Sequence, residues 1–286
     1  MKTSNLEPRT SNLSLGFSPC PNDTYIFHAL VHGLVPSPGI VFHERLEDVE
    51  TLNALILAGE LDVSKISYHL LGHVRDQYCL LSAGGALGRG CGPLIVARPG
   101  TTLADLAGKP IAVPGRYTTA CLLLRLFDPS LANLLFVPFH EIMGMVERGA
   151  VAAGVIIHES RFTYREQGLV QLLDLGAWWE ETTGCPIPLG GIVARRSLGV
   201  ETIRTVVAAI RASLLHARNN PQVALPYIRD HAQEMADEVC AAHIGLYVND
   251  FSLDLAEEGR SAVTTLLRLA EERGVIPRFE GNLFES

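Results

Sequence analysis

GPLIVARPG, residues 92–100, and LGGIVARRS, residues 189–197, are near-copies of one another and bracket the middle third of the chain. Each contains a short apolar strand that is entered through glycine. A segment that is entered and left by two similar strands is typical of a second lobe inserted on a two-strand hinge. We therefore predict one lobe from residues 1–92 and 194–286, and another from residues 93–193.

Short apolar runs alternate with helical patterns through most of the chain, which is typical of α/β proteins with mainly parallel sheets. Strands are predicted at 13–17, 39–46, 61–66, 78–83, 92–98, 110–114, 133–138, 153–158, 168–175 and 190–195. Helices are predicted at 24–33, 48–59, 117–127, 140–148 and 159–166. From residue 200 to 274 the pattern is helical only, with breaks near 219–221 and 249–250.

A second internal echo supports two lobes of related construction. ALILAGELDVSKISYH (54–69) and GMVERGAVAAGVIIHE (144–159) each contain a helix end, a glycine, a short strand and a polar end. We expect the same structural unit in each lobe, and a ligand cleft between the lobes at the carboxyl ends of the strands.

Composition narrows the functional class. The 286 residues carry a formal net charge of −8, which would repel a nucleic acid backbone, and 48% are hydrophobic, which suits a folded core. The N-terminus has no apolar secretory segment, and no window has the ~18 apolar residues of a spanning helix. The six cysteines form no Cys-x-x-Cys pair, which favours reduced thiols. We expect a cytoplasmic protein with no nucleic acid partner and no membrane insertion.

Two turns are candidates for the walls of the cleft. FSPCPNDT (17–24) follows the first strand, and Asn22, Asp23 or Thr24 could cap the helix that comes next. Thr118 and Thr119 are expected at the start of a helix in the other lobe, where hydroxyls and backbone N–H groups can bind a carboxylate. Simple capping, without ligand contact, is the alternative for both turns.

Histidines supply the strongest chemical candidate. His158 ends the strand AGVII and would face the cleft, where a histidine can act as a general base. The pairs His28/His32 and His69/His73 have the spacing of a metal site on a helix but lack the rest of such a motif. The glycine-rich stretch 84–97 leads into a strand rather than a helix, so it does not fit a dinucleotide-binding fingerprint.

Seven blocks together resemble the 1,4-dihydroxy-6-naphthoate synthase family, which belongs to the futalosine route to menaquinone. They are FSPCPNDTYIFHAL (17–30), SKISYH (64–69), GGALGRGCGPL (84–94), PGRYTTA (114–120), VIIHESRFTY (155–164), GLVQLLDLGAWWEETTG (168–184) and PLGGIVARR (188–196). The resemblance implies a periplasmic-binding-protein-like (type II) fold in a cytoplasmic lyase. It also implies a small-molecule carboxylate substrate, cyclic dehypoxanthine futalosine, and no metal or organic cofactor.

The resemblance also assigns roles to residues. It implies that His158 is the catalytic base and that Lys65, Ile66, Ser67, Thr118 and Thr119 contact the substrate. The turn residues Asn22 and Asp23 are added as substrate-binding candidates from their place in the cleft. Two alternatives stay open: chorismate dehydratase, a lyase of the same pathway and fold, and a non-catalytic solute-binding protein.

Overall fold

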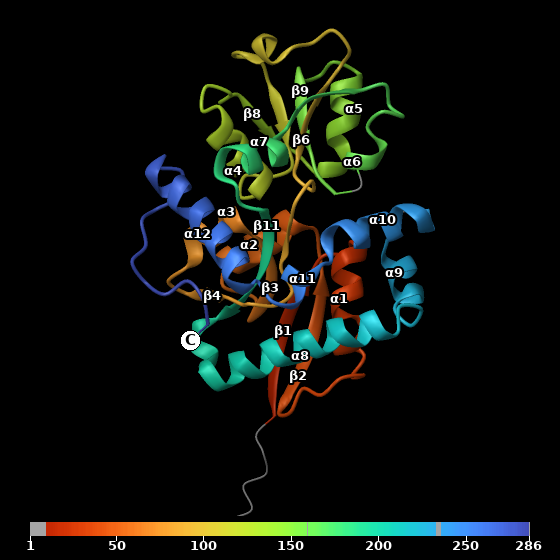
Figure 1. The fold of residues 1–286 in the computed structure, drawn as a ribbon, viewed down its shortest axis with the longest axis vertical. Coiled ribbons are helices and arrows are strands. Elements are labelled where there is room, and N and C mark those ends of the chain that lie inside the picture. The colour runs from red at the N-terminus through yellow and green to blue at the C-terminus, as the bar shows by residue number, and fades with distance from the viewer. Residues whose placement is uncertain (1–9, 159, 233–235, 286) are drawn as a thin grey trace, which may run out of the picture.

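The computed structural model describes residues 10–158, 160–232 and 236–285, which form two α/β lobes stacked along the long axis of the molecule (Figure 1). Each lobe is built on its own sheet, which confirms the predicted fold class. The chain passes to the second sheet after residue 88 and returns at residue 187. The predicted lobe boundaries stay a prediction, and residues 1–9 of the first lobe lie outside the described residues.

The first sheet has the strand order β2-β1-β3-β11-β4, with β5 pairing with β11. Its strands are β1 (Ser11–Phe17), β2 (Ile40–Leu46), β3 (Val63–Ser67), β4 (Tyr78–Leu80), β5 (Ala86–Gly88) and β11 (Ile187–Arg195). The second sheet has the order β10-β6-β9-β7-β8. Its strands are β6 (Leu94–Ala97), β7 (Ile111–Val113), β8 (Leu134–Phe136), β9 (Ala153–Ile156) and β10 (Val170–Asp174).

Both sheets are mixed, so the prediction of mainly parallel sheets is wrong. β1 runs parallel to β2 and β3, and β7 runs parallel to β8 and β9, as helical crossovers require. The two strands that contain the near-copies, β6 and β11, run antiparallel to all their neighbours. β11 is antiparallel to β3, β4 and β5, and β6 is antiparallel to β9 and β10. The chain reaches each of these strands from the other lobe. Neither strand is therefore connected to the preceding strand of its own sheet by a helical crossover, which would make the two strands parallel.

The helices between the strands begin and end at recognisable signals. In the first lobe they are α1 (Pro21–Val31), α2 (Val49–Leu57) and α3 (Tyr68–Val74); in the second they are α4 (Thr119–Phe127), α5 (Ile142–Glu147), α6 (Ser160–Thr163) and α7 (Leu175–Thr183). The carboxylates of Asp48 and Asp174 cap α2 and α7 by accepting from two backbone N–H groups each. Gly184 ends α7 in the left-handed conformation that glycine adopts without strain.

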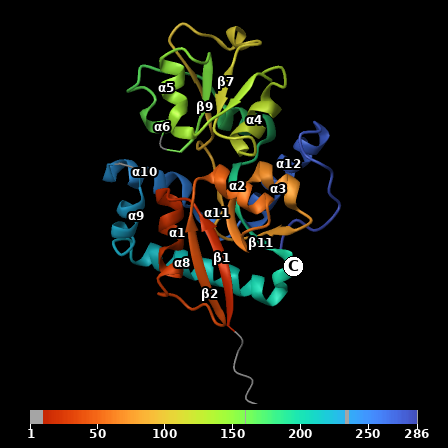
Figure 2. The same ribbon diagram turned by 180° about the vertical axis from the view of Figure 1, so that it is seen from behind.

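The C-terminal part of the chain is helical, as predicted, and covers the first lobe (Figures 1 and 2). Its helices are α8 (Val200–Asn219), α9 (Leu225–His231), α10 (Asp237–Tyr247), α11 (Asp250–Leu253) and α12 (Ala256–Glu272). α8, α9 and α10 pack against α1, while α12 packs against α3 and β11 and also reaches α4. α10 therefore lies over the start of α1, close to the second lobe.

The largest hydrophobic cluster is shared between the lobes. It contains Leu80 and Val193 of the first sheet together with Ile95 and Ile111 of the second. Helix α4 joins them because its Leu122 side chain, which is fully buried, packs into the same cluster. Burial of apolar surface therefore stabilises the contact between the lobes as well as each lobe alone.

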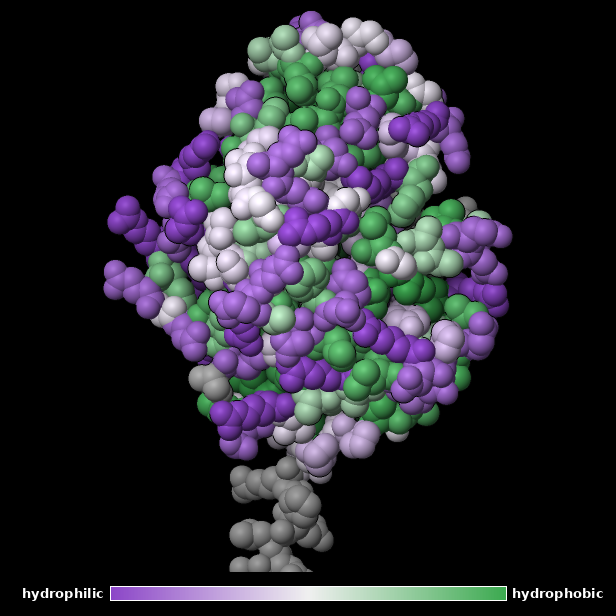
Figure 3. All heavy atoms as spheres, viewed as in Figure 1, coloured by the Kyte–Doolittle hydropathy of each residue, from purple (hydrophilic) through white to green (hydrophobic). Residues whose placement is uncertain are grey.

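Figure 3 shows the distribution of hydropathy over one face of the molecule. Hydrophilic and hydrophobic residues are interspersed over the face in Figure 3. Within the described ranges, the structure contains no helix with the length and apolar character needed to cross a bilayer.

Candidate active site

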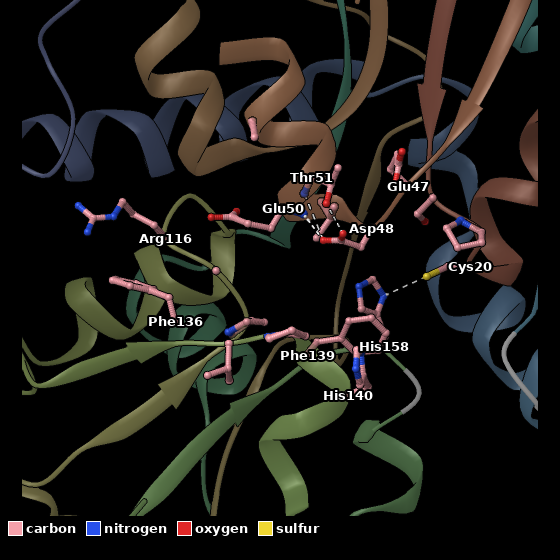
Figure 4. Close-up of a pocket in the computed structure, with 18 of the residues that line it drawn as sticks. Cys20, Glu47, Asp48, Glu50, Thr51, Arg116, Phe136, Phe139, His140 and His158 are labelled. Carbon is pink, nitrogen blue, oxygen red and sulfur yellow. Dashed lines mark hydrogen bonds between the residues drawn. The ribbon is translucent and has the colours of Figure 1, made fainter. Parts of the chain in front are cut away.

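Two connected cavities lie between the lobes. The outer groove has a volume of about 810 Å³ and is lined by residues 18–20 and 47–51 of the first lobe, and by 114–116 and 136–140 of the second (Figure 4). The inner cavity is much smaller, about 90 Å³. Ser18, Val49 and His158 line both cavities, so His158 stands where the groove meets the inner cavity.

The inner cavity brings together most of the residues that the sequence singled out. It is lined by Asn22, Asp23, Lys65, Ser67, Thr118, Thr119 and His158. Ile66 does not line it, because alternate residues of β3 face opposite sides of the sheet and the Ile66 side chain packs into the shared hydrophobic cluster.

The FSPCPNDT turn is organised differently from the prediction. Cys20 is the N-cap of α1, and no side chain caps this helix, so the expectation that Asn22, Asp23 or Thr24 would do so is wrong. The Thr24 hydroxyl donates to the Cys20 carbonyl instead. The Asp23 carboxylate is turned away from the helix start because it is occupied by the Ser18 hydroxyl at 2.8 Å and by Lys65.

A buried ion pair between Lys65 and Asp23 lines the inner cavity. Lys65 Nζ lies 2.8 Å from Asp23 Oδ1, and both side chains are less than 10% exposed. The Asn22 amide nitrogen donates to the same Asp23 oxygen at 2.7 Å. Since a buried charge is costly without a partner, the pair brings a lysine into the cavity with no net charge added. The two remaining Lys65 N–H bonds can donate to a ligand.

Thr118 and Thr119 lie at the start of α4, as predicted, and both hydroxyls are already engaged. Thr118 is the N-cap and accepts from the Cys121 N–H, while its own hydroxyl donates to the Gly115 carbonyl. The Thr119 hydroxyl donates to the Leu189 carbonyl at 2.6 Å and accepts from the Tyr68 N–H at 2.9 Å. Thr119 therefore connects α4 to α3 and β11.

Ser67 offers a hydroxyl of a different kind. Its oxygen accepts from the Asn53 amide at 3.2 Å, and its backbone N–H donates to the Asn53 oxygen. The hydroxyl hydrogen is thus oriented away from Asn53 and can donate into the inner cavity. The same Asn53 amide donates to Glu50, whose other oxygen accepts from the Tyr117 N–H across the groove. Burial raises the pKa of the Glu50 carboxyl.

His158 is held by contacts from both lobes. It follows β9 in the left-handed conformation, with φ of 55°, which is uncommon for a residue other than glycine. Figure 4 shows its ring extending from the second lobe toward Cys20, and its Nδ1 lies 3.7 Å from the Cys20 sulfur. Phe139 packs edge-on against the ring with 5.1 Å between ring centroids. The ring is therefore oriented toward the junction of groove and cavity.

The sequence prediction missed the contribution of α10. His243 and Tyr247 line the inner cavity, and the rings of His243 and His158 are stacked with centroids 6.1 Å apart. The two residues are one helical turn apart in CAAHIGLY (240–247), but an apolar helix with one histidine does not by itself indicate a site. Cys91 also lines the cavity; burial raises the pKa of its thiol to about 12, which keeps it neutral.

The two histidine pairs that have the spacing of a metal site on a helix pack their rings against tyrosines. His69 and His73 pack against Tyr117, and His28 and His32 pack against Tyr227. In the described part of the chain, no group of three His, Cys, Asp or Glu residues is placed to hold a metal ion. The expectation of a reaction without metal or cofactor stays a prediction.

The chain is similar to known proteins over nearly its whole length. A family model described as menaquinone biosynthesis matches residues 13–272. A 1,4-dihydroxy-6-naphthoate synthase of Thermus thermophilus is 55% identical over 92% of this chain and 95% of its own. A synthase of the same name from Streptomyces coelicolor is 47% identical over 93% and 95%.

A solved structure shows the same architecture at much lower sequence identity. The periplasmic aliphatic sulphonate binding protein of Escherichia coli superposes with a TM-score of 0.63 at 14% identity, covering 96% of this chain and 94% of that one. This likeness confirms the predicted periplasmic-binding-protein-like fold.

Proposed function

Because this chain belongs to the menaquinone biosynthesis family, we propose that it is a 1,4-dihydroxy-6-naphthoate synthase that acts in the cleft between its lobes. The observation that carries the proposal is the position of His158, a histidine at the junction of the groove and the polar inner cavity. The substrate we propose is cyclic dehypoxanthine futalosine, a small molecule, and the location we propose is the cytoplasm.

The proposed reaction is a base-initiated, ring-opening elimination. His158 takes a proton from the carbon beside a carbonyl, and the electron pair moves toward the carbonyl oxygen. The electron pair then returns from that oxygen and breaks the bond to the sugar-derived carbons, which leave with the bonding electrons and take a proton from the His158 imidazolium. The aromatic diol forms, and the gain of aromaticity drives the step forward. The reaction needs a base, donors for the developing negative charge, and a site with little water.

The described residues can supply the base and the donors. Cys20 and Phe139 fix the His158 ring, so the base stands in one orientation. Lys65 and the Ser67 hydroxyl lie in the inner cavity, where they can donate to negative charge on the substrate. The inner cavity is too small for the whole substrate, so we place the reacting ring at the junction and the rest of the molecule in the groove.

The experiment compares wild-type protein with His158→Asn in an assay for formation of 1,4-dihydroxy-6-naphthoate. Asparagine tolerates the left-handed backbone better than most residues, so the variant should fold and bind ligand. Turnover should fall by roughly 10²–10⁴, the usual contribution of general acid–base catalysis. The wild-type rate should rise with pH through one ionisation, since only a neutral imidazole accepts the proton, and this rise should vanish in the variant.

The matched control is His43→Asn, which changes an exposed histidine of β2 that lines neither cavity and should leave turnover within a few-fold of wild type. A near wild-type rate for His158→Asn would place the base elsewhere. Binding of the ligand without any turnover by wild-type protein would instead favour a solute-binding protein.

A further inference from the structure

His243 is buried next to the proposed base, and one of its ring nitrogens forms no hydrogen bond with any described residue. The side chain is 1% exposed and lines the inner cavity from α10. Its Nε2 lies 3.0 Å from Asn22 Oδ1, whereas its Nδ1 has no hydrogen-bond partner among the described residues. A buried polar atom without a partner is costly, so it points to a role that the protein alone does not fulfil.

The hydrogen-bond network fixes which nitrogen of His243 carries the proton. The Asn22 amide nitrogen donates to Asp23, which also holds Lys65, so the amide cannot be turned round without placing two oxygens in contact. The Asn22 oxygen therefore faces His243 and must accept a hydrogen bond from Nε2–H. A neutral imidazole has one N–H, and Nδ1 is consequently the nitrogen with a free lone pair.

The surroundings keep the ring in this neutral form. Burial, together with the nearby His158, lowers the pKa of His243 to about 3. His243 is thus a poor base at neutral pH but a permanent hydrogen-bond acceptor. Because the ring stays uncharged, it also does not oppose the appearance of positive charge on His158 when that residue takes a proton.

We propose that His243 is a substrate-binding residue whose Nδ1 accepts a hydrogen bond from a hydroxyl group of the ligand in the inner cavity. This assignment rests on the proposed function, which supplies a product with two aromatic hydroxyls. Lys65 and the Ser67 hydroxyl can donate hydrogen bonds to a ligand in this cavity, and His243 Nδ1 adds an acceptor. A ligand that carries both hydroxyl and carboxylate groups requires both kinds of partner.

Two substitutions separate the acceptor of His243 from its donor. In His243→Asn the side-chain oxygen can take the position of Nδ1, so the acceptor is kept and the donor to Asn22 is lost. In His243→Gln the amide nitrogen reaches the position of Nε2, so the donor is kept and the acceptor is lost. Both variants lose the ring contacts with His158 and Tyr247, and this loss is therefore common to the pair.

The measurements are the dissociation constant of 1,4-dihydroxy-6-naphthoate, followed by fluorescence titration, and kcat and KM for cyclic dehypoxanthine futalosine. We expect His243→Gln to bind the product roughly tenfold to a hundredfold more weakly than His243→Asn, the cost of leaving a ligand hydroxyl unpaired. Thermal melting of both variants checks that they are folded to the same extent.

Equal affinities of the two variants for the product would overturn the proposal, because the acceptor would then make no difference. Loss of folding in both variants would also count against it, since His243 would then serve the structure. If wild-type protein formed no naphthoate from its substrate, the proposed function would fail and the assignment of the ligand hydroxyl with it. If wild-type protein formed the naphthoate but the two variants bound the product with equal affinity, only the role of His243 would be overturned and the proposed function would stand.

Discussion

Buried histidines make the stability of this protein depend on pH. His69 is 2% exposed, its Nδ1 lies 3.3 Å from the Thr118 carbonyl, and burial lowers its pKa to about 3. In the unfolded chain a histidine takes a proton below pH ~6.5. The unfolded state therefore binds more protons than the folded state between pH ~6.5 and 3, and stability decreases as the pH falls through this range.

The prediction is that His69→Asn reduces this loss. Asparagine can place its amide nitrogen near the position of Nδ1 but does not titrate. Between pH 7 and pH 5 the free energy of unfolding of the variant should fall by about 2 kcal/mol less than that of wild type. Urea unfolding at a series of pH values measures the difference, with exposed His140→Asn as a control that should follow wild type. Parallel pH profiles for wild type and His69→Asn would contradict it.

Two residues of the site show the limits of prediction at this scale. The local sequence predicts that Asp23 lies in the cleft and caps a helix. Its carboxylate instead binds Lys65, which is 42 residues away and so cannot be identified as a partner from the local sequence. The left-handed backbone conformation of His158 could not be predicted either, since histidine has no strong preference for positive φ. A long-range partner determines the position of the Asp23 carboxylate, and the backbone strain at His158 depends on the surrounding structure. Neither can be predicted from the local sequence pattern.

The Thr119 hydroxyl of helix α4 is hydrogen-bonded to two backbone groups of the first lobe. The Thr119 side chain lies between the Tyr68 N–H and the Leu189 carbonyl, and it is 3% exposed. Thr119→Val keeps the shape of the side chain but leaves both backbone groups without this partner. We expect the free energy of unfolding to fall by about 1–3 kcal/mol.

Thr119→Ser is the matched control for α4, because serine retains the hydroxyl that makes both hydrogen bonds. Chemical denaturation should show Thr119→Ser much closer to wild type than Thr119→Val. A valine variant as stable as the serine variant would mean that the hydroxyl contributes nothing to the contact between the lobes.

At the scale of elements, the sequence patterns locate most strands and helices, but they do not predict α3, α7 or β5, nor the directions of the strands. Periodicity and capping residues act within one element, so the starts of α2 and α4 can be predicted from Asp48 and Thr118. Strand direction depends on where the chain comes from. The antiparallel pairing of β6 and β11 follows from the passage between lobes, which the alternation of strands and helices does not report.

The whole molecule should unfold as one unit, although it has two sheets. The shared hydrophobic cluster includes residues of both sheets and of α4, so separating the lobes would expose apolar surface from each. Both tryptophans of the chain, Trp178 and Trp179, lie in α7 of the second lobe. Their fluorescence reports unfolding of that lobe, whereas far-ultraviolet circular dichroism reports the helices of both.

We therefore predict coincident midpoints for the two signals in urea. Thermal unfolding followed by the same pair of signals should also give one transition. A fluorescence midpoint clearly separated from the circular dichroism midpoint would show that the lobes unfold independently and that the shared cluster does not couple them.

The position of β11 between β3 and β4 has a consequence for synthesis on the ribosome. Every strand of the second sheet is made in one continuous stretch, from β6 to β10, whereas the first sheet lacks its inner strand until residue 195 has been translated. At roughly 5–20 residues per second, the hundred or so residues between β4 and β11 take about 5–20 s. At the end of that interval the second sheet has all of its strands, whereas β3 and β4 still have no strand between them. The nascent chain thus completes its lobes in the reverse of the order in which it begins them.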